Sequence, residues 1–330
     1  MNQFVSILVP VYGVEKYIER CARSLFEQTY LNIEYVFIDD CSPDKSVEVL
    51  QRVVEDYPER KPYVRIIHHD RNRGLAAARN TGVAAALGEF IIWVDSDDWI
   101  DLTLVQKAIA KQKVNDADIV CYDIEVIFPN RRMYYNNKDY NDGKQLVLQM
   151  LKGEAPHQLC GHLIRRNLYV LNNIKVIEGC NQSEDLQVMP RLTFYANTIG
   201  TVHEPLYYYD RTNENSYSSN YSIQSQEQVN STLQVLHSFF QNKGSEYINA
   251  LTIGEIRAIA QSLRHLSLVK NDNGCYGNLI KRLNMIDKQY YSHVILYNRI
   301  VIILKNKFLV SLYSRLLNLV KYYANDKKIK

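Results

Sequence analysis

The sequence predicts an α/β protein with a mostly parallel sheet flanked by helices, followed by a helical C-terminal region. In the first half, short apolar runs alternate with apolar stripes at helical spacing. The apolar runs are continuous, as expected for parallel strands that are buried on both faces. From about residue 223 to 330 the periodicity is helical. We therefore expect an α/β domain at 1–222 and a helical region at 223–330.

The individual elements follow from the same patterns. The expected strands are 4–9, 35–38, 64–67 and 90–94, separated by helices over 17–26, 47–57 and 75–87. Further along, the pattern predicts a helix at 186–196, short strands at 199–202 and 206–209, and a polar loop at 211–222. Ligands of such sheets bind beyond the carboxyl ends of the strands, so the polar residues there are the candidates for a site.

Composition and charge exclude several classes of protein. Hydrophobic residues make up 46% and charged residues 23%, which is ordinary for a globular protein and argues against disorder. A net charge of +3 is too small to indicate a nucleic-acid partner. The six cysteines lack a C-x-x-C pair and favour a reducing, cytoplasmic location. The N-terminal MNQFVSILVPVYG has no basic leader, so no signal peptide is expected.

Three expected strands end in distinctive polar residues that should share one rim of the sheet. They are Pro10-Val11-Tyr12, Asp39-Asp40 and Asp95-Ser96-Asp97-Asp98. The three carboxylates of the last group repel one another, and a hard divalent cation such as Mn²⁺ or Mg²⁺ would offset that repulsion. The alternative is a solvated acidic turn in which Asp98 caps the next helix.

Three segments in order carry a resemblance to a known family. They are SILVPVYGVEKYIERCARSLFEQTYLNIEYVFIDDCSPDKS, DRNRGLAAARNTGVAAALGEFIIWVDSDDW and SEDL. Together they resemble the nucleotide-sugar-binding part of glycosyltransferase family 2, of the type found in bacterial polysaccharide assembly, over about residues 4–215. The resemblance implies the GT-A fold. It also implies an inverting, metal-dependent transfer of a sugar from a uridine-diphosphate donor to a saccharide or lipid-linked saccharide.

The resemblance also implies a donor site. It assigns Pro10, Val11 and Tyr12 to the base, and Asp40 to the N–H edge of a uracil ring, where cytosine has only an acceptor. Asp97 would be the metal ligand, with Asp95 assisting or contacting the ribose, and Asp98 would support them. The remaining donor-site candidates are Asn72, Gly74, Arg79, Ser96 and Arg211. A helix-capping turn for Asp39-Asp40 and a structural salt bridge for Arg79 remain as alternatives.

Glu184-Asp185 matches the family's acidic pair, in which the aspartate is the catalytic base. The alternative is that Ser183 and Glu184 cap the following helix. The chain departs from the family at Gly13 and at Cys160-Gly161-His162. His162 is either an acceptor or phosphate contact or a structural residue.

The segment from Tyr297 to the C-terminus mixes apolar and basic residues. The basic residues interrupt the apolar run too often for a membrane span. An amphipathic helix on the anionic inner face of the cytoplasmic membrane, near a lipid-linked acceptor, is one interpretation. The other is a helix packed on the catalytic domain or on another subunit of a homo-oligomer.

Two other functions compete with the transferase. A nucleotidyltransferase would be expected to carry a glycine- and basic-rich phosphate loop, which VPVYGVEKY is not. A catalytically inactive GT-A-fold binding or assembly protein would need neither Asp97 nor Asp185.

Overall fold

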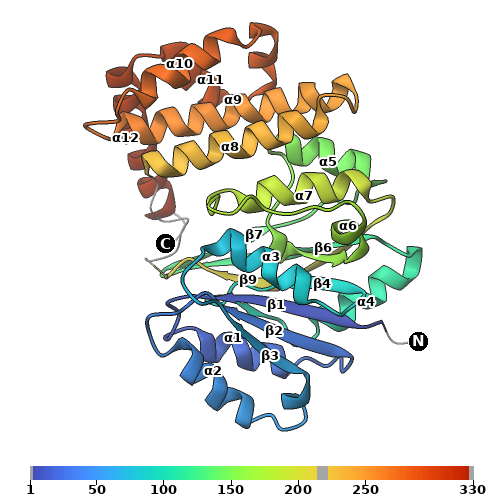
Figure 1. Cartoon of the computed structure of the whole chain (residues 1–330). Helices are drawn as coiled ribbons and strands as arrows, with labels where there is room; N and C mark the ends of the chain where they lie inside the picture. The colour runs from blue at the N-terminus through green and yellow to red at the C-terminus, as the bar shows by residue number, and fades with distance from the viewer. Residues whose placement is uncertain (1–2, 214–221, 327–330) are drawn as a thin grey trace. The chain divides into compact units, whose positions relative to one another are not determined.

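The computed structural model describes residues 3–213 and 222–326, with side chains as far as residue 318. The chain divides into two compact units, Met1–Met150 with Ala155–Asn220 and Leu151–Glu154 with Tyr221–Lys330. Figure 1 shows the strands in the first unit, from blue to yellow along the chain, and helices in the second, from orange to red. The expected α/β fold with a helical C-terminal region is confirmed.

The sheet has the order β3-β2-β1-β4-β8-β6-β9-β5, with β7 paired to β6. Its first four strands are parallel to one another. Beyond them β8 runs antiparallel to both β4 and β6, whereas β6 and β9 are parallel. The strands are β1 (Val5–Val11), β2 (Ile33–Asp39), β3 (Val64–His68), β4 (Phe90–Trp93), β5 (Trp99–Ile100), β6 (Ile119–Phe128), β7 (Arg131–Tyr135), β8 (His162–Arg165) and β9 (Ile199–Asp210).

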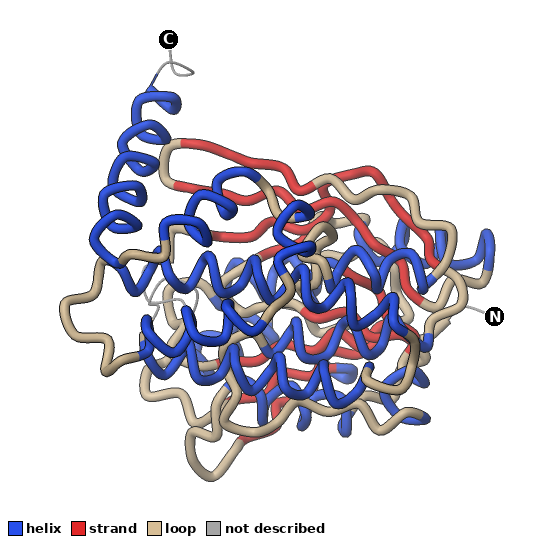
Figure 2. Tube along the Cα trace, turned by 90° about the horizontal axis from the view of Figure 1, so that it is seen from above, coloured by secondary structure: helices blue, strands red, loops and turns tan. Residues whose placement is uncertain are grey.

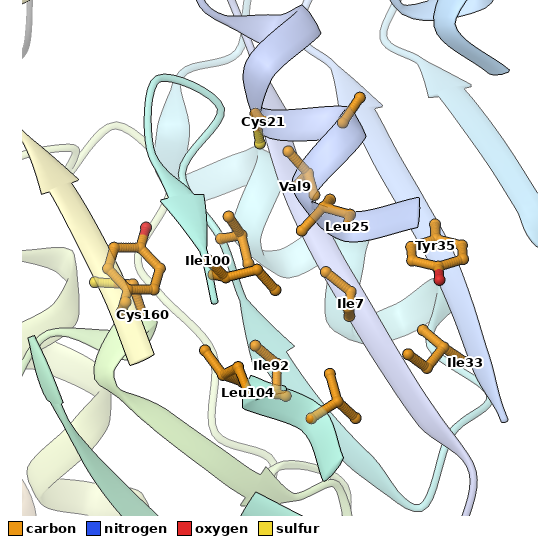
Figure 3. Close-up of a cluster of buried hydrophobic side chains, with 14 of the residues drawn as sticks. Ile7, Val9, Cys21, Leu25, Ile33, Tyr35, Ile92, Ile100, Leu104 and Cys160 are labelled. Carbon is orange, nitrogen blue, oxygen red and sulfur yellow. The ribbon is translucent and has the colours of Figure 1, made fainter. Parts of the chain in front are cut away.

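Helices cover both faces of this sheet. One face packs on α1, α2 and α4, and Figure 3 shows side chains of β1, β2 and β4 meeting Cys21 and Leu25 of α1 there. The opposite face receives α3, whose Gly82 lies against Ile38 and Trp93. The helices of this unit are α1 (Ile18–Phe26), α2 (Ser46–Glu55), α3 (Leu75–Ala85), α4 (Leu104–Asn115), α5 (Gly143–Leu151), α6 (Asn167–Leu171) and α7 (Glu184–Tyr195).

The structure corrects two sequence-based expectations. The two short strands predicted at 199–202 and 206–209 are one strand, β9. His203, Glu204 and Pro205 hid its continuity because they interrupt the apolar pattern where the register with β6 shifts. The helix predicted at 186–196 begins earlier, at Glu184, so both acidic candidates lie in its first turn.

The second unit is built around the long helix α9. Apolar residues of α9, including Ile256 and Leu263, form a core with α10, α11 and α12. The segment 151–154 joins this unit through Gly254, where an added Cβ would lie 1.9 Å from the carbonyl oxygen of Leu151. No helix within the described residues is both long and apolar enough to cross a membrane. The helices are α8 (Ile223–Phe240), α9 (Ser245–Ser267), α10 (Cys275–Met285), α11 (Leu296–Leu304) and α12 (Lys307–Asp326).

Candidate active site

Polar residues follow β1, β2 and β4, which are neighbours in the sheet, so they lie on one rim. Val11 at the end of β1 pairs with Asp39 at the end of β2, and the amide of Asp40 donates to the carbonyl of Val11 at 3.0 Å. Pro10 and Val11 are buried, whereas Tyr12 is 46% exposed. Tyr12 is therefore the member of this group that presents an open aromatic ring.

Asp40 is buried and holds a turn of the chain. Its Oδ1 accepts from the amide of Arg73 at 2.8 Å, and its Oδ2 from the amide of Gly74 at 2.7 Å. The ring Nδ1 of His69 lies 2.6 Å from the same Oδ1. The chain itself thus engages both oxygens of the carboxylate that the resemblance assigns to a uracil ring.

Asp39 makes a separate turn, because its Oδ1 accepts from the amide of Ser42 at 2.9 Å and its Oδ2 lies 2.9 Å from Nδ1 of His68. Of the alternative for Asp39, the turn is present, but Asp39 caps no helix, because the N-cap of α2 is Lys45. Asn72, the next donor candidate, is exposed beside the turn that Asp40 fixes.

Gly74 is fixed by a residue that the sequence did not reveal. Its φ of +85° suits glycine, and an added Cβ would lie 2.4 Å from the side-chain Nδ2 of Asn181. The side-chain oxygen of Asn181 accepts from the amide of Ala76 at 2.9 Å, at the N-terminus of α3. The segment before the acidic pair is therefore tied to the beginning of α3.

Arg79 of α3 is the centre of the site. Its guanidinium is 2% exposed, pairs with Asp95 at 2.8 Å, and lies 3.6 Å from Glu184 and 3.8 Å from Asp185. Burial alone would lower its pKa, but these three carboxylates outweigh burial and raise it. The structural-salt-bridge alternative for Arg79 therefore describes its observed contacts, and the bridge joins the acidic turn to the acidic pair.

The acidic pair opens α7. Burial raises the pKa of Asp185 to about 6; Arg79 opposes this rise, whereas Asp95 adds to it. Burial and the charge of Asp185 raise the pKa of Glu184. Ser183 has a left-handed backbone, φ 64°, and its side chain makes no capping hydrogen bond, so the alternative in which Ser183 caps α7 is wrong.

Asp97 lies at the tip of the acidic turn. Its Oδ2 accepts from the side-chain Nδ2 of Asn213 at 2.8 Å, and its backbone carbonyl accepts from the guanidinium of Arg20 at 2.8 Å. Arg20 also pairs with Asp210 at 2.6 Å. Burial, and then the charge of Asp95, raise the pKa of Asp97 to about 6.

Asp98 is completely buried and anchors the turn to β9. Its Oδ2 accepts from the hydroxyl of Tyr207 at 2.6 Å, and its Oδ1 accepts from the amide of Asp210 at 2.7 Å. The expectation that Asp98 supports its neighbours fits these contacts, whereas capping of the next helix is wrong. Ser96 is also buried.

The residues present fit a divalent cation that uses few protein ligands. Among the described residues, no group of three or more His, Cys, Asp or Glu side chains is arranged to hold a metal. Asp98 is fully engaged internally, which leaves Asp95 and Asp97 as oxygen donors. Mg²⁺ commonly binds through one or two carboxylates together with substrate phosphates and water, and this donor set matches that pattern.

Two other candidates have structural contacts. Arg211 donates to the hydroxyl of Tyr209 at 3.2 Å and stands two residues before Asn213. His162 is buried, its Nδ1 lies 2.8 Å from the carbonyl oxygen of Gln158, and burial lowers its pKa to about 4. A neutral, buried ring fits the structural interpretation of His162.

Sequence reasoning missed four residues that shape the site. Each contacts a candidate far away in the chain, so no local motif marks it. They are Arg20, Asn181, Tyr207 and Asn213.

The fold, with this carboxylate-lined rim at the strand ends, is of the GT-A type. The family model described as "Glycosyl transferase family 2" matches residues 6–170, and the chain belongs to that family. The expected family and fold are therefore confirmed.

Similar proteins include EpsJ of Bacillus subtilis, an uncharacterized glycosyltransferase, at 33% identity over 66% of this chain and 63% of EpsJ. The minor teichoic acid biosynthesis protein GgaB of the same organism is 27% identical over 63% of this chain and 23% of GgaB. The match thus spans less than two thirds of either relative. S. aureus TarS, solved with UDP-GlcNAc, has the same fold, with a TM-score of 0.72, 19% identity and coverage of 94% of this chain and 92% of TarS.

Proposed function

We propose that this chain is an inverting, metal-dependent glycosyltransferase that uses a uridine-diphosphate sugar. The observation that carries the proposal is the convergence of Asp95, Glu184 and Asp185 on the single guanidinium of Arg79. A merely structural ion pair needs one carboxylate, whereas three carboxylates around one cation leave excess negative charge at a solvent-reachable rim.

The donor would lie along the ends of β1, β2 and β4. The open ring of Tyr12 offers a stacking surface for the base, and the turn at Arg73 and Gly74, held by Asp40, forms the wall beside it. The uridine preference rests on the family resemblance and on the solved complex of TarS with UDP-GlcNAc. Arg211, close in sequence to Asn213, is proposed to face the diphosphate.

Asp97, assisted by Asp95, would hold Mn²⁺ or Mg²⁺. When bound, the cation would neutralise negative charge on the diphosphate. The cation would also stabilise the ionised carboxylates, because it would relieve the repulsion from Asp95 that contributes to the raised pKa of Asp97. Asn213 and Arg20 would keep the Asp97 turn in place.

Asp185 would act as the catalytic base. Its carboxylate takes the proton of an acceptor hydroxyl as that oxygen bonds to the anomeric carbon, and the bond from this carbon to the diphosphate oxygen breaks with its electron pair. A single displacement of this kind inverts the anomeric configuration. Glu184 and Arg79 would orient Asp185.

The acceptor is proposed to be a saccharide or lipid-linked saccharide of a bacterial surface polymer, at the cytoplasmic side of the membrane. Support comes from the relationship to GgaB and from cysteines without paired spacing. No observation favours the inactive assembly protein or the nucleotidyltransferase over this proposal.

The proposal is tested with a panel of uridine- and guanosine-diphosphate sugars, each with Mn²⁺ or with a chelator, scored for nucleoside-diphosphate release. We expect release from at least one uridine-diphosphate sugar, only with metal. Release from guanosine-diphosphate sugars alone would overturn the donor assignment. Undiminished release with chelator would overturn the metal assignment.

A further inference from the structure

The last helix of the chain, α12, has two different faces. Val310 is completely buried and belongs to the core that α9 organises, and Ser314 on the same side is also buried. The opposite side carries large apolar residues that remain open. They are Phe308 (69% exposed), Leu309 (44%), Leu312 (49%) and Leu316 (58%).

These four positions form one stripe, because they fall within about 100° of one another on a helix with 3.6 residues per turn. Isolated exposed apolar residues are normal, whereas four that adjoin on one helix indicate a surface that is covered by something else. The preceding helix α11 also exposes Leu296 (72%) and Ile303 (71%). Figure 2 shows α12 as the final helix leading to the C-terminal trace.

The sequence that contains the stripe is strongly basic. Residues 286–330 contain nine lysines and arginines against two aspartates, a net charge of +7. Because the whole chain carries +3, residues 1–285 carry −4. Arg315 is exposed and, at 100° per residue, borders the apolar stripe.

We propose that the exposed face of α12 binds the surface of an anionic lipid bilayer, with the apolar stripe inserted between the headgroups and Arg315 beside the phosphates. An anionic bilayer matches both properties of the face, because its acyl region accepts apolar side chains and its headgroups attract positive charge. A second copy of the chain would bring two positively charged surfaces together. A nucleic acid would pair with the positive charge but would leave the apolar stripe exposed to water.

This surface is independent of the transfer reaction, and its test needs no donor. The full-length protein is floated with vesicles of phosphatidylcholine alone or with about 30% phosphatidylglycerol. We expect at least about tenfold stronger binding to the anionic vesicles, reduced by high salt. The test variant combines Phe308→Ser, Leu312→Ser and Leu316→Ser, and we expect it to lose at least about tenfold in vesicle binding.

A control with the same number of substitutions removes exposed leucines elsewhere. It combines Leu31→Ser, Leu87→Ser and Leu171→Ser, whose side chains are 75%, 64% and 78% exposed. The control should bind vesicles like the wild type. Circular dichroism checks that both variants remain helical, and Arg315→Glu, which leaves the stripe intact, provides a second test through weaker anionic binding.

Three outcomes would overturn the proposal. The first is equal binding of wild type and the α12 variant to anionic vesicles. The second is a change from oligomer to monomer in the α12 variant, by light scattering, without any change in vesicle binding, which would make the face an interface between copies. The third is a wild type that transfers sugar but does not bind vesicles, which would uphold the proposed function and refute the membrane surface.

Discussion

Asp185 combines two properties that a general base needs, access from solvent and a pKa close to neutrality. Its side chain is 20% exposed, whereas that of Glu184 is 9% exposed. Its pKa of about 6 leaves it mostly ionised at pH 7 while it still binds a proton readily. At the scale of single residues, this separates the proposed base from its neighbour.

Replacing Asp185 with Asn should lower kcat by about 10²–10⁴-fold, because the amide cannot take the acceptor proton. Donor affinity, measured by calorimetry, should stay within about twofold, since the proposed donor contacts lie on other residues. The matched control is Asp139→Asn, which removes an exposed carboxylate paired with His203 and should leave kcat unchanged. Near-normal kcat in the Asp185 variant would exclude its role as base.

The activity should also depend on pH in a defined direction. The base works when it is deprotonated, so kcat should be level above pH 7 and fall below about pH 6, by roughly tenfold per pH unit. A pH–rate profile measured at saturating donor and metal checks this. A kcat that stays constant down to pH 4.5 would show that the group that titrates in catalysis is not Asp185.

Asp97→Asn should make the protein without metal or donor more stable, while it lowers the rate of sugar transfer. The pKa of Asp97 rises from 3.8 to about 6 on folding, so its ionised form opposes folding above pH 6, and this cost vanishes below pH 3.8, where both states are protonated. Urea unfolding should show a gain of roughly 1–3 kcal/mol at pH 8 that shrinks towards pH 4. A destabilised variant at pH 8 would contradict the unfavourable charge of Asp97.

Sequence patterns and the family resemblance identified the residues in local motifs but missed those that act through long-range contacts. Asp95, Asp97 and Asp185 stand in short recognisable segments. Asn213 reaches Asp97 across 116 positions and Asn181 reaches Ala76 across 105, so only the folded chain brings them together. For Asp40, the sequence located the rim correctly and could not show that the amides of Arg73 and Gly74 engage its oxygens.

At the scale of elements, α3 connects the proposed donor rim to α7, the helix that carries the proposed base. Asn181 binds the N-terminus of α3 and packs on Gly74. Asn80 of the same helix exchanges two hydrogen bonds of 2.9 Å with the backbone of Val176. The segment that leads into α7 is therefore held against α3 at two separate points.

Gly74→Ala should be more destabilising than Gly179→Ala. Both glycines have nearly the same backbone, φ +85° and +83°, but an added Cβ meets Asn181 at 2.4 Å at Gly74 and nothing within 4 Å at Gly179. We expect about 1 kcal/mol of backbone strain in each variant and a further loss of roughly 1–3 kcal/mol at Gly74. Urea unfolding of both variants measures the difference, and equal stabilities would show that the Asn181 contact is not tight.

Element type was predictable where the apolar pattern is continuous, as in β1, β2 and β4. In β9 the strand type was predicted but its continuity was not, because the single strand crosses from buried positions through exposed His203 and Glu204 and back. Its continuity depends on pairing with β6, which a local pattern cannot reveal.

At the scale of the whole molecule, the proposed donor and base residues all lie in the first unit, and the exposed apolar stripe of α12 lies in the second. The sequence predicted the helical character of the second unit and left two interpretations of its end. In the structure, one face of α12 packs on α9 of its own helical unit and the other face stays exposed, because α9 covers only one side of it. Exposure of this kind depends on tertiary packing, which periodicity alone cannot specify.

In the proposed site two aspartates have separate roles, since Asp97 holds the metal and the diphosphate whereas Asp185 accepts the proton. Calorimetric titration of UDP into wild type, Asp97→Asn and Asp185→Asn, each with and without Mn²⁺, tests it most directly. We expect Mn²⁺ to strengthen UDP binding at least about tenfold in wild type and in Asp185→Asn, and to have little effect in Asp97→Asn. UDP affinity that does not respond to Mn²⁺ in the wild type, or that responds equally in all three proteins, would contradict the claim.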